Sequence, residues 1–568
     1  METITSCQWV NSFHLKHSVN NSIIVKEKYV TIDKETSEVI KVEDKFKYID
    51  NPKRTIYVTK PQYRTHKYKR DVEDLSKLDK IVVEDQYLLM ELKKLFGIPK
   101  YPMSSIREIC NSPYIYHADI SMQALIRARY QANQKHSIIP LRIGSLDIET
   151  NVDGSDVINC ITFIAEKNVY TAALEGNMVK EDPVTGKKKT ISKNDILKLI
   201  PEKIQTYIDQ YGFNINFVVA KNELQLLKWI FEQIHREKVD FITIWNIAFD
   251  IPKIIDRIKH YSFAPEAFFC HPDIKKDLWY CKFSEDKQKK AHISEYWHWF
   301  HCTHYSQFID AMLLYARVRK TESKEPSYTL DAISTKVLGV GKLKFSEGSH
   351  FEMQRYRFDE YVVYNMVDAM LLMMMEWKNH DIMQMIQLTG SSPYPDFSKQ
   401  TVMLKNIYYK FCLERGKAFA SVGKDIVGPY DNRFIKKGGA VLKASLVEDI
   451  GLNNLVERPD YESMIVPVAA DLDYKAYYPS TESMYALAKE NKILTVVKLE
   501  GKEDKEGIEE LLGGVAMPQA NSVWIGTDYF GLPNYQEWID IFANEVVTKQ
   551  LRGEKVLFQT ILNNRCPK

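Results

Sequence analysis

A strand that ends in two carboxylates constrains this chain more than any other feature. The apolar-rich run 138–143 leads into a segment in which Asp147 and Glu149 alternate with Leu146 and Ile148. Because side chains alternate along a β-strand, the two acids lie on one face and the two apolar residues on the other. Adjacent carboxylates repel each other, whereas Mg²⁺ and Mn²⁺ prefer closely spaced oxygen ligands. The pair is therefore either part of a metal site or two solvated acids at a strand end.

Two later segments supply further acids. Residues 241–252 are typical of a buried strand that passes through a polar turn into a helix, which places Asp250 at the junction. Residues 361–372 have a strongly helical composition. Because side chains four apart on a helix share a face, Tyr364 and Asp368 are expected to project together. The acids are thus predicted to come from separate elements and to meet at one site.

The patterns Asp-x-Glu, Asn-x-x-Phe-Asp and Tyr-x-x-x-Asp follow one another in this order. Together they resemble the proofreading 3′→5′ exonuclease of family B DNA polymerases, in the variant whose last acid is accompanied by tyrosine. Segments 308–315, 326–331 and 339–344 extend the resemblance. They are more similar to the replicative polymerases of T-even-like bacteriophages than to the eukaryotic or archaeal ones.

The resemblance implies a fold class and a division of the chain. The expected fold is α/β: a ribonuclease H-like exonuclease domain with a mixed sheet flanked by helices, an N-terminal α+β domain and a partial polymerase palm. Several domains are also expected from the 568 residues, because single cores stop growing at about 250 to 300 residues. The predicted parts are an N-terminal domain (1–140), the exonuclease domain (141–385), and a linker with the N-terminal part of the palm (386–568).

The resemblance also implies roles for the acids. Four carboxylates would hold two divalent ions about 4 Å apart, a spacing suited to phosphoryl transfer. The ions are expected to be Mg²⁺, with Mn²⁺ as the alternative. One ion would lower the pKa of a bound water, and the other would stabilise the departing 3′ oxygen. The expected ligands are Asp147, Glu149, Asp250 and Asp368.

Three other residues of this region take roles from the same resemblance. Tyr364 would orient the attacking water through its hydroxyl group. Asn246 and Phe249 would lie near the terminal nucleotide. For Phe249, an equally good interpretation from the sequence is a core residue.

The segment after residue 386 contains a glycine pair preceded by two cations. Lys436, Lys437, Gly438 and Gly439 offer charge for phosphates and a backbone that a phosphate chain can approach closely. They resemble the element that family B polymerases place between the exonuclease and the palm, where it contacts DNA. We therefore expect these four residues to bind the substrate.

Residues 473–480 resemble the first catalytic motif of the polymerase palm. By this resemblance Asp473 would bind both catalytic Mg²⁺ ions, and Tyr478 would close the sugar pocket against a 2′-hydroxyl. Ala476 and Tyr477 depart from the family pattern and leave the metal ligand intact. The fingers motif and the Asp-Thr-Asp hairpin of the family are not found in the sequence. This chain alone is therefore expected not to polymerise DNA, and another polypeptide or a longer gene product would complete the site.

The expected activity is Mg²⁺-dependent removal of 3′-terminal deoxynucleotides, preferring single-stranded or frayed ends, because the terminal base must leave its stack. The expected partners are a DNA primer–template, single-stranded 3′ ends, a sliding clamp and, once the polymerase is completed, dNTP. Two alternatives are a stand-alone 3′→5′ exonuclease and a non-catalytic DNA-binding scaffold for replication.

Composition and local patterns indicate where the protein acts. Eight cysteines in 568 residues form no dense disulfide framework, and no secretory signal opens the sequence, so a reducing cytoplasm is expected. The phage resemblance implies a viral protein in the host cytoplasm. The apolar run 370–375 is far short of a membrane span, so no membrane partner is expected.

Three other stretches contain clusters of basic residues or possible metal ligands. The basic and tyrosine-rich segment 60–70 suits a single-stranded nucleic-acid track or simply a solvated surface. Residues 180–193 form a lysine-rich, insertion-like loop. In 296–304, histidines and a cysteine follow strand alternation better than a zinc-ligand pattern, so a histidine-bearing strand is predicted there and zinc is not.

Overall fold

Two compact units make up this computed structural model. The first unit comprises residues 1–54, 82–88 and 120–415, and the second comprises 55–81, 89–119 and 416–568. The structure describes residues 2–422 and the strands 492–498 and 556–562, apart from residues 17, 19, 65–71, 98–104, 111, 291, 321–323, 344–349 and 390–399.

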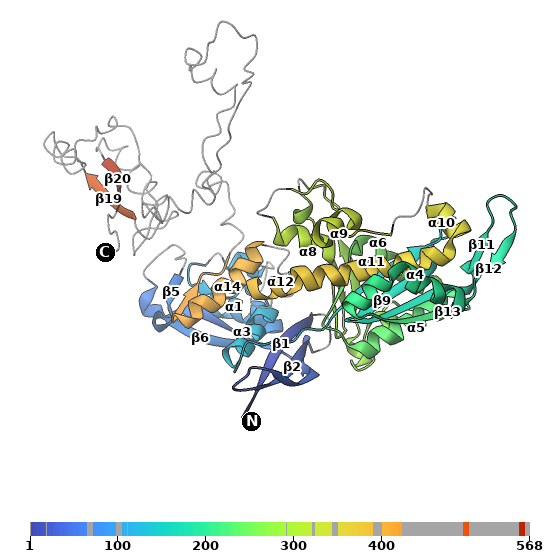
Figure 1. Cartoon of the computed structure of the whole chain (residues 1–568). Coiled ribbons are helices and arrows are strands. Elements are labelled where there is room, and N and C mark those ends of the chain that lie inside the picture. Colours follow the sequence, from blue (N-terminus) through green and yellow to red (C-terminus); the bar gives the residue numbers. More distant parts are fainter. Residues whose placement is uncertain are drawn as a thin grey trace, which may run out of the picture. The chain divides into compact units, whose positions relative to one another are not determined.

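A six-stranded mixed sheet forms the centre of the first unit (Figure 1). β8 pairs antiparallel with β9, and β9 pairs antiparallel with β10. The pairs β10–β13, β8–β14 and β14–β17 are parallel. Across the sheet the strands are β13 (Asn214–Ala220), β10 (Asn168–Leu174), β9 (Ile158–Ala165), β8 (Ile143–Thr150), β14 (Phe241–Ile244) and β17 (Gln307–Asp310).

Helices cover both faces of this sheet. One face packs against α4 (Lys193–Tyr211) and α11 (Phe358–Asn379), in a core that includes Cys160, Ile164 and the apolar residues of α11. The other face, with Leu146 and Ile148, packs against α5 (Glu223–Glu237) and α6 (Ile247–His260). The predicted mixed sheet flanked by helices is therefore confirmed. It is consistent with a ribonuclease H-like exonuclease.

α11 is the most deeply buried helix of this arrangement. Every residue from Tyr361 to Glu376 is buried, and the apolar run 370–375 is its inner continuation. Apolar side chains all round are typical of a helix enclosed by a core. Within the described part of the chain, no helix combines the length and the apolarity that crossing a bilayer requires.

Shorter elements complete the first unit. β16 is a strand paired with β15 in the register Cys281↔Cys302, which confirms the predicted histidine-bearing strand. The remaining elements are α3 (Met122–Ala132), β11 (Val179–Glu181), β12 (Lys188–Thr190), α7 (Glu266–Phe269), β15 (Cys281–Glu285), β16 (His298–Cys302), α8 (Ala311–Val318), α9 (Leu330–Leu338), α10 (His350–Tyr356), α12 (Asp381–Thr389) and α14 (Gln400–Glu414).

An antiparallel sheet opens the chain and belongs to the same unit. It consists of β1 (Thr3–Leu15), β2 (Ser22–Asp33) and β3 (Val39–Ile49). Lys26 and Lys28 of β2 share one face of the strand and are fully buried. Their ammonium groups lie 2.5 and 3.0 Å from the carboxylate of Asp240, directly before β14. Burial would raise the pKa of Asp240, but the two lysines hold it below its ordinary value. These ion pairs fix β2 to the entry of the central sheet.

The second unit contains most of a three-stranded sheet in the order β6-β4-β7, and β18 pairs with β5. β19 and β20 form a separate antiparallel pair. The bounds are β4 (Lys53–Thr59), β5 (Val72–Asp74), β6 (Leu78–Glu84), α1 (Leu88–Leu95), α2 (Ile106–Ile109), β7 (Ile115–Tyr116), β18 (Lys417–Phe419), β19 (Lys492–Lys498) and β20 (Val556–Leu562).

Candidate metal centre

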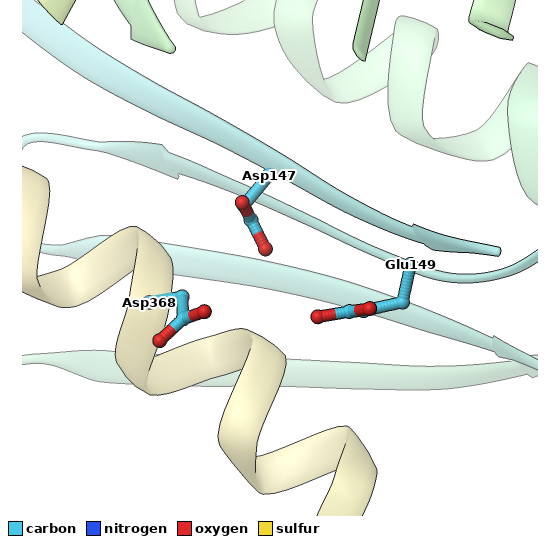
Figure 2. A group of neighbouring side chains, drawn as sticks. All are labelled: Asp147, Glu149 and Asp368. Atoms are coloured by element: carbon cyan, nitrogen blue, oxygen red, sulfur yellow. The ribbon is translucent and has the colours of Figure 1, made fainter. Parts of the chain in front are cut away.

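Three carboxylates converge between the central sheet and α11. Asp147 and Glu149 project from β8 and Asp368 from α11, with their carboxylate groups directed toward one another (Figure 2). One oxygen of each lies within 4.8 Å of the others. Asp147 and Glu149 are half-buried, and Asp368 is buried. This is an oxygen-only donor set, the kind that Mg²⁺ and Mn²⁺ prefer.

Alternation along β8 produces the arrangement. Leu146 and Ile148 enter the core on the side of α5 and α6, so the odd-numbered residues face α11. Ser145, also on the odd-numbered face, donates from Oγ to the backbone oxygen of Ala369 at 2.8 Å. This bond fixes the strand against the helix one residue after Asp368.

Asp250 lies in the first turn of α6, which follows β14, the strand that pairs with β8. β14 ends at Ile244 and α6 begins at Ile247, as predicted for this strand-to-helix junction. Asp250 is buried but is not among the three acids whose oxygens meet within 4.8 Å. It still acts on them electrostatically, because its charge contributes to the raised pKa of Asp147.

The acids perturb one another strongly. Burial raises the pKa of Asp147 well above its usual value, and the charges of Asp368, Asp250 and Glu149 add to the effect. Burial, and then the charge of Glu149, likewise raise the pKa of Asp250. Like charges held close in a low-dielectric site favour protonation, and a bound cation reverses that preference. Binding of a divalent cation by these carboxylates is therefore expected to release protons.

α11 supplies hydrogen bonds as well as an acid. Asn365 Nδ2 donates to Asp147 Oδ2, and the Tyr361 hydroxyl donates to Glu149 Oε2, both at 2.6 Å. Residues 361, 365 and 368 follow an i, i+4, i+7 spacing, so they share a helical face. Sequence reasoning missed Tyr361 and Asn365, although this periodicity around Asp368 is a signal that could have identified them.

A lysine from a distant loop reaches the same acids. Lys342 Nζ lies 2.6 Å from Asp368 Oδ2 and 2.8 Å from the Tyr364 hydroxyl oxygen. Burial opposes the charged form of Lys342, but Asp368 and Tyr364 raise its pKa. The loop is held by a bond from the Lys342 backbone N–H to Asp331 Oδ1 at 2.8 Å. No local pattern in the sequence indicates this contact.

Tyr364 and Asp368 project together, as predicted from their spacing. The Tyr364 hydroxyl oxygen meets the same ammonium group as Asp368 Oδ2, so Lys342 links the two side chains. Burial, and then the charge of Asp368, raise the pKa of Tyr364. The phenol therefore stays protonated near neutral pH and retains a proton to donate.

Asn246 and Phe249 lie at the start of α6. Asn246 is exposed, and its side chain makes no capping hydrogen bond to the helix. The ring of Phe249 is 45% exposed, with Lys253 Nζ 5.9 Å from its centroid. The interpretation of Phe249 as a core residue is therefore wrong, because a core ring would be enclosed. Both side chains are free to meet a ligand.

The remaining predicted site residues lie outside the described part of the chain. They are Lys436, Lys437, Gly438, Gly439, Asp473 and Tyr478. Their roles stay predictions.

Comparison with known proteins gives one family. Residues 94–333 match the family model described as DNA polymerase family B, exonuclease domain. The match includes β8 and the first turn of α6, with Asp147, Glu149 and Asp250, and it ends before α11. No curated protein matches the chain. The match covers less than half of the chain and shows that residues 94–333 are similar to the exonuclease domain of family B DNA polymerases.

Proposed function

We propose that this chain removes nucleotides from the 3′ end of DNA by metal-dependent hydrolysis. The observation that supports this most directly is the convergence of three carboxylates within 4.8 Å between β8 and α11. Asp368 Oδ1 adds a test of fit: it is buried and has no hydrogen-bond partner among the described residues. A buried acceptor without a donor is costly unless something else satisfies it. The carboxylate oxygens of Asp147, Glu149 and Asp368 are ligands of the kind that a hard divalent cation prefers.

The residues that would hold two Mg²⁺ or Mn²⁺ ions are Asp147, Glu149, Asp250 and Asp368. Bound ions of this kind supply a water of lowered pKa and stabilise negative charge on the departing oxygen. Asn365 and Tyr361 hold two of the carboxylates in fixed orientations by hydrogen bonds. Such outer partners commonly set the affinity and geometry of a metal site.

Tyr364 would orient the attacking water through its hydroxyl group, because that group lies beside Asp368 and remains protonated. Burial raises the pKa of Asp368 to about 7, and the ammonium group of Lys342 opposes this rise while it also contacts the Tyr364 hydroxyl. Asn246 and Phe249 would contact the terminal nucleotide. An exposed ring such as Phe249 can stack on any base, which suits an enzyme without sequence preference.

We further propose that the exonuclease belongs to a T-even-like phage polymerase with parts 1–140, 141–385 and 386–568, acting in the host cytoplasm. Lys436, Lys437, Gly438 and Gly439 would bind DNA, Asp473 would bind catalytic metal, and Tyr478 would select deoxynucleotides. The dNTP, a sliding clamp and the other polymerase motifs would join in the completed enzyme. These proposals depend on the sequence resemblance alone.

The test uses the purified chain, a 5′-labelled primer annealed to a template, and Mg²⁺, with and without the four dNTPs. A parallel sample has both Asp147→Ala and Glu149→Ala. We expect the primer to shorten, the double variant to lose this activity, and no extension to occur. Extension would contradict an incomplete polymerase site. A primer that neither shortens nor grows would instead favour a DNA-binding scaffold.

A further inference from the structure

The lysine-rich insertion forms a well-defined hairpin that projects from the first unit. β11 and β12 pair in the register Val179↔Thr190, Lys180↔Lys189 and Glu181↔Lys188. Residues 179–190, hereafter the β11–β12 hairpin, extend beyond the end of the central sheet beside α10 (Figure 1). Val184 at its tip is 92% exposed. A strand pair that projects into solvent needs stabilising contacts at its turn or at its base.

The turn and the base hold that shape. Asp182 Oδ1 accepts hydrogen bonds from the backbone N–H groups of Val184 and Thr185 at 3.0 and 2.7 Å. Just outside the hairpin, Met178 and Ile191 are buried in the core that contains α11. The hairpin is therefore anchored at its base and closed by a formed turn. Its exposed side chains are presented at fixed places.

Its charges divide into two sets. Lys180 pairs with Asp359 at 2.7 Å, and Glu181 pairs with Arg355 at 2.7 Å. The other cations, Lys187, Lys188 and Lys189, are exposed and have no ion-pair partner among the described residues. Lys189 also stands directly opposite Lys180, although like charges facing each other across a strand pair are unfavourable. Lys188 stands directly opposite Glu181 and helps to lower the pKa of Glu181, and Lys189 acts in the same way on Asp195, so part of this charge is balanced locally. The hairpin still carries more cations than anions, and Lys187, Lys188 and Lys189 are exposed.

The base of the hairpin is connected to the strand of Glu149. Asn177, at the start of the approach to β11, donates from Nδ2 to Asn151 Oδ1 at 2.8 Å. Asn151 follows Glu149 by two residues. The hairpin therefore begins at the edge of the acidic cluster.

The ion pairs lead to the same corner of the site. Arg355 is next to Gln354, whose Nε2 donates to the Tyr361 hydroxyl at 2.9 Å and to the backbone oxygen of Thr150 at 2.7 Å. Asp359 precedes Tyr361 by two residues on α11, and Tyr361 holds Glu149. Each anchor of the hairpin is thus one or two residues from a group that supports Glu149.

The length of α11 gives the distance between the base of the hairpin and the acidic cluster. Asp359 and Asp368 are nine positions apart, which is about 13 to 14 Å along a helix with a rise of about 1.5 Å per residue. In a strand with duplex geometry, successive phosphates advance by about 3.4 Å, so this length covers roughly four nucleotides. The base of the hairpin, where Lys180 meets Asp359, is therefore separated from Asp368 by about the length of four nucleotides.

We propose that the β11–β12 hairpin contacts the phosphate backbone of the strand being degraded, a few nucleotides from its 3′ end. Lys187, Lys188 and Lys189 neutralise phosphates without reading bases, which suits a nuclease that must accept any sequence. The inference depends on the proposed function, because DNA at the acidic cluster is what brings phosphates to the hairpin.

The first measurement is binding without cleavage. The full chain and a variant with Lys187→Gln, Lys188→Gln and Lys189→Gln are titrated against a fluorescent single-stranded 20-mer in EDTA, at several salt concentrations. Each phosphate contact contributes about 0.7 to the slope of log affinity against log salt for single strands, so the slope should become shallower by about 2. At low salt the variant should bind about tenfold more weakly. Equal affinity and equal slope would overturn the proposal and favour an acidic protein as the partner.

A matched control removes the same charge from another strand. Lys41→Gln, Lys45→Gln and Lys47→Gln change three exposed lysines of β3. This variant should bind the 20-mer as the unaltered chain does. Equal weakening by both variants would show a general charge effect and refute a specific contact. All substituted side chains are exposed, and matching thermal unfolding curves check that both variants fold.

The second measurement separates DNA contact from support of the metal site. With Mg²⁺ present, KM is compared for a trinucleotide, too short to reach the hairpin, and for the 20-mer. The hairpin variant should raise KM for the 20-mer about tenfold relative to KM for the trinucleotide, in line with the binding loss. An equal increase for both substrates would contradict the proposal. Because the binding assay needs no hydrolysis, it still decides the inference if the proposed nuclease activity is not found.

Discussion

Tyr361→Phe tests whether hydrogen bonds from α11 tune the metal site. The substitution deletes one hydroxyl group, which donates to Glu149 Oε2 at 2.6 Å and accepts from Gln354 Nε2 at 2.9 Å. The ring keeps its place, because Tyr361 is buried in the core of the sheet and α11. The variant therefore isolates the effect of the hydroxyl on the Glu149 carboxylate.

The magnitude follows from that contact. A hydrogen bond to a charged group contributes about 1.5 to 3 kcal/mol, and each 1.4 kcal/mol changes an equilibrium constant about tenfold. The apparent affinity for Mg²⁺ should therefore fall about 10- to 100-fold, the range typical of lost outer partners at metal sites. At saturating Mg²⁺ the maximal rate should change much less, because the ligands themselves remain.

The effect should depend on pH with a definite sign. Burial raises the pKa of Glu149, and the bond from Tyr361 opposes this rise. Without the bond the pKa rises further, so protons compete better with Mg²⁺. The loss of Mg²⁺ affinity should therefore be larger at about pH 6.5 than at about pH 8.5.

The assay is the initial rate of 3′ shortening of a single-stranded oligonucleotide as Mg²⁺ is titrated at each pH. Tyr207→Phe is the matched control, because Tyr207 packs against the same core and does not contact the acids. Thermal unfolding of both variants separates weaker metal binding from weaker folding. An unchanged Mg²⁺ requirement at both pH values would refute the reasoning.

Two further substitutions test the supports of the site. Asp240→Asn removes one of the two carboxylates beside the fully buried Lys26 and Lys28 and leaves them only Asp44, at 3.7 and 3.0 Å. Urea unfolding at pH 7 should therefore show a loss of about 1.5 to 3 kcal/mol, the contribution of a hydrogen bond to a charged group. The pKa of Asp240 is lowered in the folded state, so its contribution to the free energy of unfolding is present above about pH 4 and is lost as the pH falls below that. The difference in stability between the variant and the unaltered protein should therefore shrink at low pH. Equal stability of the two proteins at pH 7 would contradict the argument. Gly341→Ala places a Cβ atom against Asp331 Oδ1, so the carboxylate must shift away from the Lys342 backbone N–H that it accepts from, which should loosen the loop of Lys342 and lower the nuclease rate. Gly176→Ala meets nothing within 4 Å and is the control for that measurement; equal rates for both alanine variants would count against a role for the loop.

Local periodicity predicted the parts of the site that depend on one element. Alternation in β8 gave the shared face of Asp147 and Glu149, and helical spacing gave the joint projection of Tyr364 and Asp368. The junction between a buried strand and a helix gave the position of Asp250. In each case the backbone geometry of a single segment determines the direction of the side chain.

Contacts between distant segments could not be predicted in this way. Lys342 meets Asp368 only because the loop after α9 folds over α11, and no pattern near Lys342 encodes that approach. The pairing of Lys26 with Asp240 joins residues 214 positions apart. The exposure of Phe249 also depends on tertiary packing, since an apolar residue in an amphipathic segment fits either face equally well.

The spacing of residues along α11 has a consequence for how such a chain can change over time. Each residue of an α-helix turns the next by about 100°, so inserting or deleting one residue between Tyr361 and Asp368 would rotate one of them by about 100° away from their shared face. Every residue from Tyr361 to Glu376 is buried, so the surrounding core would have to repack to restore the match. Point substitutions can accumulate along this stretch one at a time, whereas a single insertion or deletion moves Tyr361 and Asp368 off their shared face of the helix at once. Selection is therefore expected to preserve the number of residues between Tyr361 and Asp368 more strictly than the identity of each residue in between.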